Sequence, residues 1–426
     1  MANRKLCVIN VVGLTPELCQ HAPHLSSLGT IQPWQAPYPA VTCTSQATLL
    51  TGKLPREHGI VGNGWFFRET GEVRFWQQAN QLIQGQKFYE DYETAKMFWW
   101  FNQGAPVRWF ATPKPHYGAD GSKVFGILDQ TDCELEKAIG TFPFFTFWGP
   151  KAGLPCSQWI ARASAEVLRR NQPELTLVYL PHLDYEFQRK PEHDPQRVRE
   201  VDDCARVIIE AAKETNTQVV AVSEYGLVPV NRAVMINQEL RRAGLLEVRD
   251  GPFGEMMMPL DSKAFAVVDH QLAHVYVRDS SRKEEIRQLL QKMEGIDQVV
   301  DPGELALDHP RSGELIALAK PDAWFAYYYW LDDQRAPDFA RTVDIHRKPG
   351  YDPCELFMTS GLRAGFRLAQ KLMGFRYKMD VIPLEPGLVR GSHGLRPVPE
   401  QGPLVIGANP PNQMTQFSTY VRDLMG

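Results

Sequence analysis

Residues 38–65 read YPAVTCTSQATLLTGKLPREHGIVGNGW, and this stretch says more about the fold than any other part of the chain. An extended, proline-bearing segment ends near Thr42 and gives way to a helical run over residues 46–51. A helix N-terminus presents free backbone N–H groups and the positive end of the helix dipole, so it favours an anion. Asn63, between two glycines, could offer a side-chain amide to the same anion. Thr42 beside such a site indicates phosphoryl or sulfuryl transfer; a buried strand–turn–helix with ordinary turn glycines is the alternative.

Short apolar runs elsewhere predict buried parallel strands, each followed by a helical pattern. We expect strands at residues 6–12, 96–101, 175–180 and 218–222, and helices at 156–170, 196–215 and 282–294. This alternation predicts an α/β fold with a doubly wound, mostly parallel sheet. Ligands of such sheets bind beyond the carboxyl ends of the strands. The polar residues that follow the predicted strands are therefore the candidates for a site: Thr42, Asp184 and Glu224.

The pattern of the sequence changes between residues 256 and 378. An alternating strand is expected at 264–277 and an aromatic strand at 323–330, with a helix between them. These elements predict a smaller α+β subdomain at 256–378, inserted into a core formed by residues 1–255 and 379–426. His270 and His274, in the alternating strand, are expected to share one face of it as structural hydrogen-bonding groups.

The composition is that of an ordinary soluble globular protein. Of the 426 residues, 43% are hydrophobic and 23% charged, and the net charge of -4 comes without a basic cluster, so we expect no nucleic-acid partner. No apolar run approaches the ~18–20 residues of a membrane span, and we expect no membrane partner. The seven cysteines are odd in number and lack CxxC spacing, which predicts reduced thiols and a cytoplasmic protein.

The order of these motifs resembles the alkaline phosphatase superfamily, in particular its type I phosphodiesterase/nucleotide pyrophosphatase branch. The resemblance runs over residues 6–407 and is strongest from Thr42 through the LLTG of residues 49–52 and the LPREHGI of residues 54–60 to Asn63. It implies an alkaline phosphatase-like fold in which Thr42 attacks phosphorus and Asn63 binds a non-bridging phosphate oxygen. It also implies two divalent cations, usually zinc, which lower the pKa of the threonine hydroxyl and neutralise the transferring group.

One family cation is held by an aspartate, a histidine four residues later and a histidine in a C-terminal GxHG motif. Asp184 and the His393 of a GSHG sequence match two of these positions. Gln188 stands where the first histidine is expected. An amide oxygen is neutral and binds zinc more weakly than imidazole does.

The second family cation is held by an aspartate at the end of the first strand and by the Asp-His pair of an SDHG motif. Val12 occupies that aspartate position, and Asn10 lies on the same strand face two residues earlier. The SDHG equivalent reads SEYG, so Glu224 keeps a carboxylate while Tyr225 replaces the imidazole. A phenol with a pKa of about 10 is a poor metal ligand unless it is deprotonated.

The leading prediction is a metal-dependent hydrolase of small phosphate esters, either phosphodiesters or pyrophosphates, with Thr42 as nucleophile. One or two divalent ions (Zn²⁺, Mn²⁺ or Mg²⁺) would be held by Asp184, Glu224, His393, Gln188, Tyr225 and Asn10, an oxygen-rich set that favours the harder ions. No nearby arginine resembles the clamp for a phosphomonoester, which favours a diester. The alternatives are a protein that binds a phosphoanion without catalysis and a phosphoryl transferase acting on a small metabolite.

Two further segments carry expectations about the surroundings of the site. Trp65, Phe66 and Phe67 adjoin the Thr42–Asn63 module and could form an aromatic wall for a base, aryl or prenyl-like leaving group, with core packing as the alternative. The charged run at residues 344–352 is expected to form a solvated loop, and a substrate-facing loop is the alternative.

Overall fold

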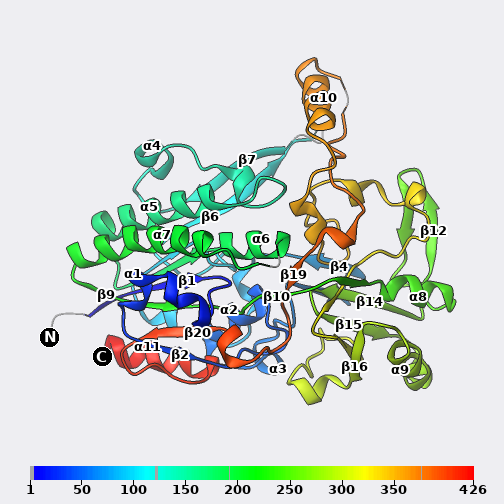
Figure 1. Ribbon diagram of the computed structural model, residues 1–426, viewed down its shortest axis with the longest axis horizontal. Coiled ribbons are helices and arrows are strands. Elements are labelled where there is room, and N and C mark those ends of the chain that lie inside the picture. Colours follow the sequence, from blue (N-terminus) through cyan, green and yellow to red (C-terminus); the bar gives the residue numbers. More distant parts are fainter. Residues whose placement is uncertain (1–3, 120–122, 191, 376) are drawn as a thin grey trace.

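The core of the protein is an eight-stranded sheet in the order β2-β20-β9-β1-β8-β5-β6-β7 (Figure 1). The computed structural model describes residues 4–119, 123–190, 192–375 and 377–426. Five neighbouring strands are parallel: β9 (Thr217–Val222), β1 (Lys5–Val11), β8 (Leu175–Leu180), β5 (Thr94–Met97) and β6 (Trp109–Tyr117). The outer strands run antiparallel to their neighbours: β2 (Thr30–Pro33), β20 (Leu404–Gly407) and β7 (Lys123–Asp129). The predicted doubly wound, mostly parallel α/β sheet is confirmed.

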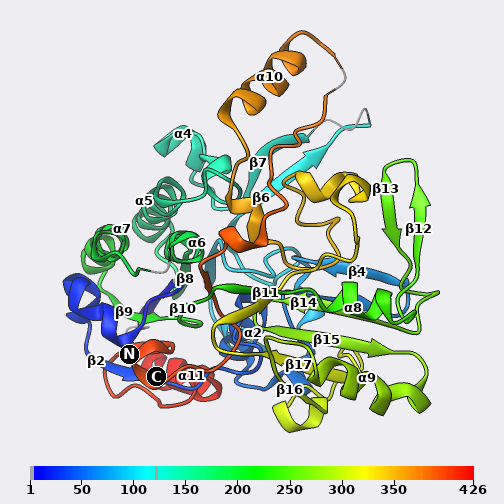
Figure 2. The same cartoon turned by 45° about the vertical axis from the view of Figure 1, so that its right-hand side comes forward.

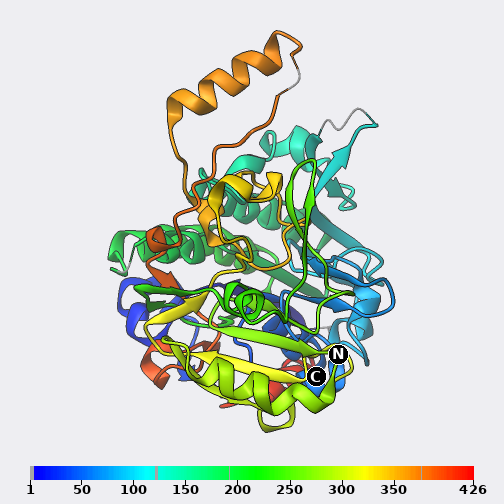
Figure 3. The same ribbon diagram turned by 90° about the vertical axis from the view of Figure 1, so that its right-hand side faces the viewer.

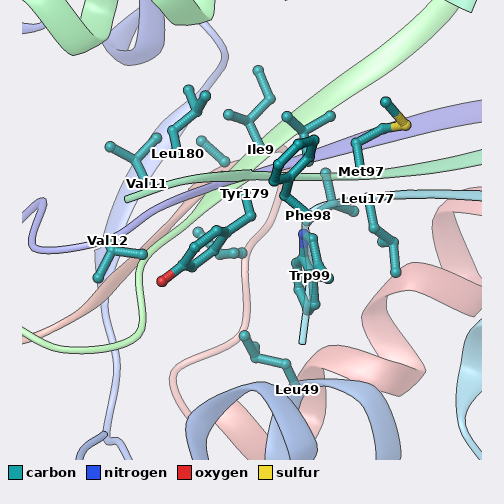
Figure 4. Close-up of a cluster of buried hydrophobic side chains, with 14 of the residues drawn as sticks. Ile9, Val11, Val12, Leu49, Met97, Phe98, Trp99, Leu177, Tyr179 and Leu180 are labelled. Atoms are coloured by element: carbon teal, nitrogen blue, oxygen red, sulfur yellow. The ribbon is translucent and has the colours of Figure 1, made fainter. Parts of the chain in front are cut away.

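Helices cover both faces of this sheet. One face carries α5 (Leu154–Asn171), α6 (His182–Arg189) and α7 (Pro195–Glu214), and the other carries α2 (Thr42–Thr51) and α11 (Phe417–Met425) (Figures 1 and 2). Because both faces are covered, the central strands are apolar on both sides rather than alternating. Figure 4 shows side chains of β1, β8 and β5 in this core, with Val12 among them just beyond β1.

A second sheet lies beside the first and has the order β14-β15-β17-β16, with α9 (Lys283–Gln291) packed on it. Its strands are β14 (Ala264–Asp269), β15 (Leu272–Val277), β17 (Leu315–Ala319) and β16 (Ile296–Val300). The hydrophobic core of this sheet also includes Phe66 and Phe75 from early in the chain. The division of the chain at residues 256 and 378 stays a prediction.

The single alternating strand expected at 264–277 is wrong. The chain forms the hairpin β14–β15, with His270 and Gln271 in the turn and φ of 60° at His270. His270 and His274 therefore do not share a strand face. The turn directs His270 toward the candidate site, while His274 hydrogen-bonds the Val61 carbonyl at 2.8 Å, the structural role expected of it.

Two other predicted strands are shorter than expected. The strand predicted at 96–101 is β5, which ends at Met97, because Phe98 and Phe101 have φ of 66° and 61°, outside the β region. The strand predicted at 323–330 is β18 (Ala323–Phe325). Residues 98–101 instead turn away just beyond the carboxyl end of β5, whose neighbours in the sheet are β8 and β6.

One helix stands away from the body of the protein. The helix α10 (Gly361–Leu372) projects from the same end of the molecule as the β6–β7 hairpin in all three ribbon views (Figure 3). Among the described residues, no helix combines the length and apolar character that crossing a membrane requires.

Candidate active site

Thr42 is the first residue of α2, which begins four residues before the helical run predicted at 46–51, and it lies near the carboxyl ends of the parallel strands. Val41 before it is extended, with φ of -133° and ψ of 160°, so the chain enters the helix directly after the proline-bearing segment. The Thr42 Oγ1 lies 3.0 Å from the Tyr225 hydroxyl oxygen. The Thr42 side chain is almost fully buried.

Asn63 closes the start of α2 and is fixed by a residue that sequence reasoning missed. Its Oδ1 accepts a hydrogen bond from the Cys43 backbone N–H at 2.9 Å. Its backbone N–H and its Nδ2 donate to the two oxygens of Asp269, at 2.6 and 3.0 Å. One amide hydrogen of Asn63 is left for an anion beside Thr42. Burial raises the pKa of Asp269 to about 6 against the opposing effect of these bonds.

Tyr225 connects the Thr42 hydroxyl to Asp184. The phenol donates to Asp184 Oδ1 at 3.3 Å. A phenol carries one proton, so Thr42 is the donor in the 3.0 Å contact, and the hydrogen bonds run from Thr42 through Tyr225 to Asp184. Burial, and after it the Asp184 carboxylate, raises the pKa of Tyr225 well above its usual value. The phenol is therefore neutral over the physiological range.

His393 presents an unpaired ring nitrogen to Asp184. Its Nδ1 bonds the Ala40 carbonyl at 2.7 Å, which places the proton on Nδ1 and leaves a lone pair on Nε2. This Nε2 is buried, has no hydrogen-bond partner among the described residues, and lies 3.5 Å from Asp184 Oδ1. Gln188 donates from Nε2 to Asp184 Oδ2 at 2.7 Å and accepts from the Tyr351 hydroxyl at 2.8 Å.

Four aromatic rings form a continuous stack along one side of Asp184. Tyr225 and His393 have ring centroids 3.5 Å apart and planes within 5° of parallel. His270 follows at 3.6 Å from His393, and Tyr351 at 3.8 Å from His270. Burial lowers the pKa of His270 well below its usual value, so a neutral imidazole fills the middle of the stack. The stack restricts the movement of Tyr225 and His393.

Glu224 lies on the other side of Thr42 and is held by amides. Asn10 and Gln46 both donate to its Oε1, at 2.5 and 2.7 Å, while Oε2 has no partner among the described residues. The Trp100 backbone N–H donates to Gln46 Oε1 at 2.8 Å and fixes the orientation of that amide. Burial raises the pKa of Glu224 to about 8, even though the two amide bonds oppose this shift. The carboxyl group is mostly protonated at neutral pH.

The aromatic surroundings differ from the expected wall. Trp65 and Phe66 are buried, and Phe66 packs edge-to-face on Phe265 of the second sheet, so these two belong to the core. A different group of half-buried indoles surrounds Tyr351. The ring centroids of Trp76 and Trp148 each lie 6.0 Å from that of Tyr351. The ring centroid of Trp100 lies 4.8 Å from that of Trp76.

The sequence and the fold together identify the family of the chain. A sequence model described as type I phosphodiesterase / nucleotide pyrophosphatase matches residues 6–352. The chain belongs to this family. It is therefore part of the alkaline phosphatase superfamily and an enzyme of the type that hydrolyses phosphoesters. No curated protein matches the chain by sequence.

Solved structures of similar fold come from the same superfamily. The phosphonoacetate hydrolase of Sinorhizobium meliloti 1021, solved in complex with phosphonoformate, has a TM-score of 0.60 at 14% identity over 100% of this chain and 96% of its own. Murine ectonucleotide pyrophosphatase/phosphodiesterase 5 has a TM-score of 0.57 at 12% identity over 99% of this chain and 95% of its own. The human protein of the same name has a TM-score of 0.60 at 11% identity, covering 99% and 95%.

One of the two cation positions of the phosphodiesterase family fits the residues present. Neighbouring ligands on a tetrahedral ion with bonds of 2.0–2.1 Å lie about 3.4 Å apart. Asp184 Oδ1 and His393 Nε2 are separated by 3.5 Å, and the nitrogen lone pair is unpaired. An amide oxygen from Gln188, after rotation of its side chain, would complete an oxygen-rich set. These residues fit one divalent cation.

The other family cation position does not fit. Val12 lies in an apolar cluster with Val11 and Tyr179 (Figure 4). Glu224 is largely protonated and has N–H groups directed at it, and Tyr225 is a neutral phenol. Over the described residues, no three His, Cys, Asp or Glu side chains converge on a point that could hold an ion. The predicted set of six ligands thus separates into an Asp184–His393–Gln188 group and an amide-bound Glu224 group.

Sequence reasoning missed the residues that the second sheet and the loop at 344–352 bring to the site. Asp269 and His270 come from the β14–β15 turn, and Asp269 binds Asn63 across 206 positions of the chain. The solvated loop expected at 344–352 is wrong for its second half, where residues 348–352 are buried, and the alternative of a substrate-facing loop stays a prediction. Lys348 is buried in ion pairs with Asp352 and Glu355, each at 2.7 Å, and the buried chain around them places Tyr351 in the site.

Proposed function

We propose that this chain hydrolyses phosphodiesters of small molecules through a covalent intermediate in which the Thr42 oxygen carries the phosphoryl group together with its remaining alcohol. The observation that supports this most directly is the chain of hydrogen bonds from Thr42 Oγ1 to Tyr225 at 3.0 Å and from Tyr225 to Asp184 at 3.3 Å. It gives a buried hydroxyl at a helix N-terminus a defined path for its proton. A threonine hydroxyl needs such activation, because it is a weak nucleophile at neutral pH.

In the first step, the Thr42 oxygen forms a bond to phosphorus and the bond from phosphorus to the leaving oxygen breaks. The hydroxyl proton passes to the Tyr225 oxygen as the Tyr225 proton passes to Asp184. The leaving alkoxide takes a proton from water, and the free amide hydrogen of Asn63 binds a non-bridging oxygen. In the second step, water attacks phosphorus, its proton goes to solvent, and the Thr42 oxygen recovers the proton held on Asp184.

Asp184, His393 and Gln188 would hold a single divalent cation beside Thr42. When bound, such an ion withdraws electron density from oxygen and neutralises charge on the transferring group. The protein residues supply the rest: Tyr225 orients the Thr42 hydroxyl, and the ring stack keeps Tyr225 in place. The neutral amides and the protonated Glu224 on the other side add no negative charge that would repel the substrate.

A diester with an aromatic or nucleobase leaving group suits these surroundings better than a monoester. Within the described residues, no lysine or arginine forms an ion pair or hydrogen bond with Thr42, Asn63 or Asp184, so the second charge of a monoester lacks a partner. The half-buried indoles of Trp76, Trp100 and Trp148 offer faces for stacking. An inactive variant of the murine phosphodiesterase 5 was solved with AMP, which also favours nucleotide-like substrates.

The test compares wild type, Thr42→Ala and Thr44→Ala on a bis-aryl phosphate and an aryl monophosphate after chelation and reconstitution with Zn²⁺, Mn²⁺ or Mg²⁺. Thr44 is the matched control, because it is a buried threonine of the same helix with no hydrogen-bond partner for its hydroxyl among the described residues. We expect Thr42→Ala to lose at least about 1000-fold in kcat/KM and Thr44→Ala to retain activity.

Mass spectrometry of acid-quenched enzyme checks the intermediate directly. With the bis-aryl phosphate, wild type is expected to gain the mass of one arylphosphoryl adduct on the peptide that contains Thr42, and Thr42→Ala is expected to gain none. Equal rates for wild type and Thr42→Ala would exclude Thr42 as the nucleophile. Faster turnover of the monoester would overturn the substrate class, and absence of turnover with every metal would favour a protein that only binds phosphoanions.

A further inference from the structure

The helix α10 exposes its apolar side chains rather than burying them. None of its residues is buried, and Leu362, Phe366 and Leu372 have exposed fractions of 88%, 60% and 80%. Isolated exposed apolar residues are common on soluble proteins, but a contiguous exposed patch marks a binding surface. Met373 and Phe375, just after the helix, extend the patch and are likewise exposed.

The sequence of α10 divides the helix into two faces. At 100° per residue, Leu362, Phe366, Leu372 and Met373 fall within one continuous arc, together with the small residues Gly365 and Ala369. The opposite arc carries Arg363, Arg367, Gln370 and Lys371. Apolar residues on one side and basic residues on the other are the pattern of a helix that lies in a membrane–water interface.

The charge of this segment is opposite to that of the protein as a whole. Residues 360–379 contain five basic residues and no acidic one, while the chain has a net charge of -4. Asp380, at the base of the segment, forms ion pairs with Arg363 and Arg367 and ties the helix to the body. Lys371 has no ion pair with any described residue. Counting Asp380, residues 360–380 still carry a net charge of +4, which is complementary to an anionic surface.

A second exposed apolar group lies at the same end of the molecule. The β6–β7 hairpin exposes Tyr117 and Val124, at 58% and 64%, and Phe125 of this hairpin contacts the exposed ring of Phe145. In Figures 1 to 3 the hairpin and α10 both project from this end, away from α11 and the second sheet. Two projecting apolar elements at one end suit a broad, flat partner.

We propose that α10 inserts its apolar face into the surface of a membrane that contains anionic phospholipid, with the basic face directed at the headgroups. A helix of 12 residues is too short to cross the hydrocarbon core, so it lies in the interface and leaves the enzyme on one side. This departs from the expectation of no membrane partner, which considered only spanning segments. The inference is independent of the proposed chemistry at Thr42.

The test measures co-sedimentation of the full chain with vesicles of phosphatidylcholine, with and without phosphatidylglycerol, at low and high salt. The double variant Leu362→Ser/Phe366→Ser removes apolar surface from α10. Phe253→Ser is the matched control, because Phe253 has a similar exposed fraction of 62% and lies outside both projecting elements. Lys371→Gln removes one unpaired charge. Thermal unfolding of each variant checks that the body is intact.

We expect wild type and Phe253→Ser to bind anionic vesicles, and the double variant to bind at least about tenfold more weakly. Lys371→Gln should weaken binding by roughly fivefold, and high salt should weaken it for wild type. Failure of wild type to sediment with anionic vesicles would overturn the proposal, as would equal binding by the double variant. Concentration-dependent dimerisation that the double variant abolishes, without vesicle binding, would assign the surface to a second copy of the chain instead.

Discussion

The two groups of side chains on either side of Thr42 differ in whether they could bind a cation. On one side, His393 Nε2 has no hydrogen-bond partner among the described residues and lies 3.5 Å from Asp184 Oδ1. This separation is suitable for two ligands of one cation. On the other, Asn10 and Gln46 donate N–H groups to Glu224, and burial keeps this carboxyl largely protonated. Glu224 Oε1 already accepts two hydrogen bonds, and the partial positive charges of the donating amide hydrogens would repel a cation. Retaining a carboxylate in a motif is therefore not the same as retaining a metal site.

Removing the carboxylate on the cation-accepting side should have the largest effect. Asp184→Ala is expected to lower metal affinity and kcat/KM by at least about 100-fold, since it removes an ionic ligand and the proton acceptor of Tyr225. Glu224→Gln is the matched variant and should keep its bound metal. Metal content after dialysis, together with steady-state kinetics, measures both. Loss of metal from Glu224→Gln but not from Asp184→Ala would reverse the assignment of the two sides.

Tyr225→Phe should have the next largest effect on the rate. It removes the hydroxyl between Thr42 and Asp184 but keeps the ring that stacks on His393 at 3.5 Å. We expect kcat to fall by about 30-fold with KM nearly unchanged, because the loss affects proton transfer rather than binding. Stopped-flow measurement of the first turnover is the readout. A change confined to KM would mean that the phenol contacts substrate instead of carrying the proton.

Glu224→Gln should change the pH dependence of stability. Burial raises the pKa of Glu224 from its ordinary value of 4.5 to about 8 in the folded state, so the folded protein binds more protons between these pH values. The stability that Glu224 contributes is complete below about pH 4.5 and is lost as pH rises toward 8, by up to about 1.4 kcal/mol per pH unit. Urea unfolding at several pH values should therefore show the variant gaining stability relative to wild type as pH rises. A constant difference would indicate that Glu224 is ionised throughout.

Tyr351→Phe should have the smallest effect. It removes only the hydrogen bond to Gln188 Oε1 and keeps the ring beside His270. Because a single such bond contributes about 1 kcal/mol, metal affinity is expected to change by less than about tenfold. Titration with Mn²⁺ compares the variant with wild type. A loss as large as that of Asp184→Ala would mean that Tyr351, rather than Gln188, completes the cation-binding group.

The central part of the site could be predicted from the sequence because the sheet topology brings it together. Thr42, Asp184 and Glu224 follow the carboxyl ends of strands or begin a helix at that edge, and parallel strands bring these ends to one place. The contacts made by the residues at the expected ligand positions are harder to predict from the sequence. Sequence comparison finds that Gln188 and Tyr225 replace histidines, but only packing reveals that Tyr225 joins Thr42 to Asp184.

The sequence patterns of two segments, the β14–β15 hairpin and the run at 344–352, indicate a different local structure from the one observed. The alternation of residues 264–277 continues through the β14–β15 turn, and no glycine or asparagine marks the turn at His270 and Gln271. The run at 344–352 is charged, which indicates a solvated loop when the partners of the charges are unknown. The structure pairs Lys348 with Asp352 and Glu355, and burial then becomes possible.

The tip of the β14–β15 hairpin also bears on how the enzyme could be divided. Asp269 binds both the backbone and the side chain of Asn63, and Asn63 in turn closes the first turn of α2. A fragment that ends before residue 256 would retain most of the large sheet but would lose the anchor of Asn63. Such a fragment could fold and still bind anions poorly, since the two halves of its anion site are encoded more than 200 residues apart. Activity would return only when the missing piece is supplied, so a split ahead of the hairpin, which leaves the hairpin whole on the second part, would give two complementing parts.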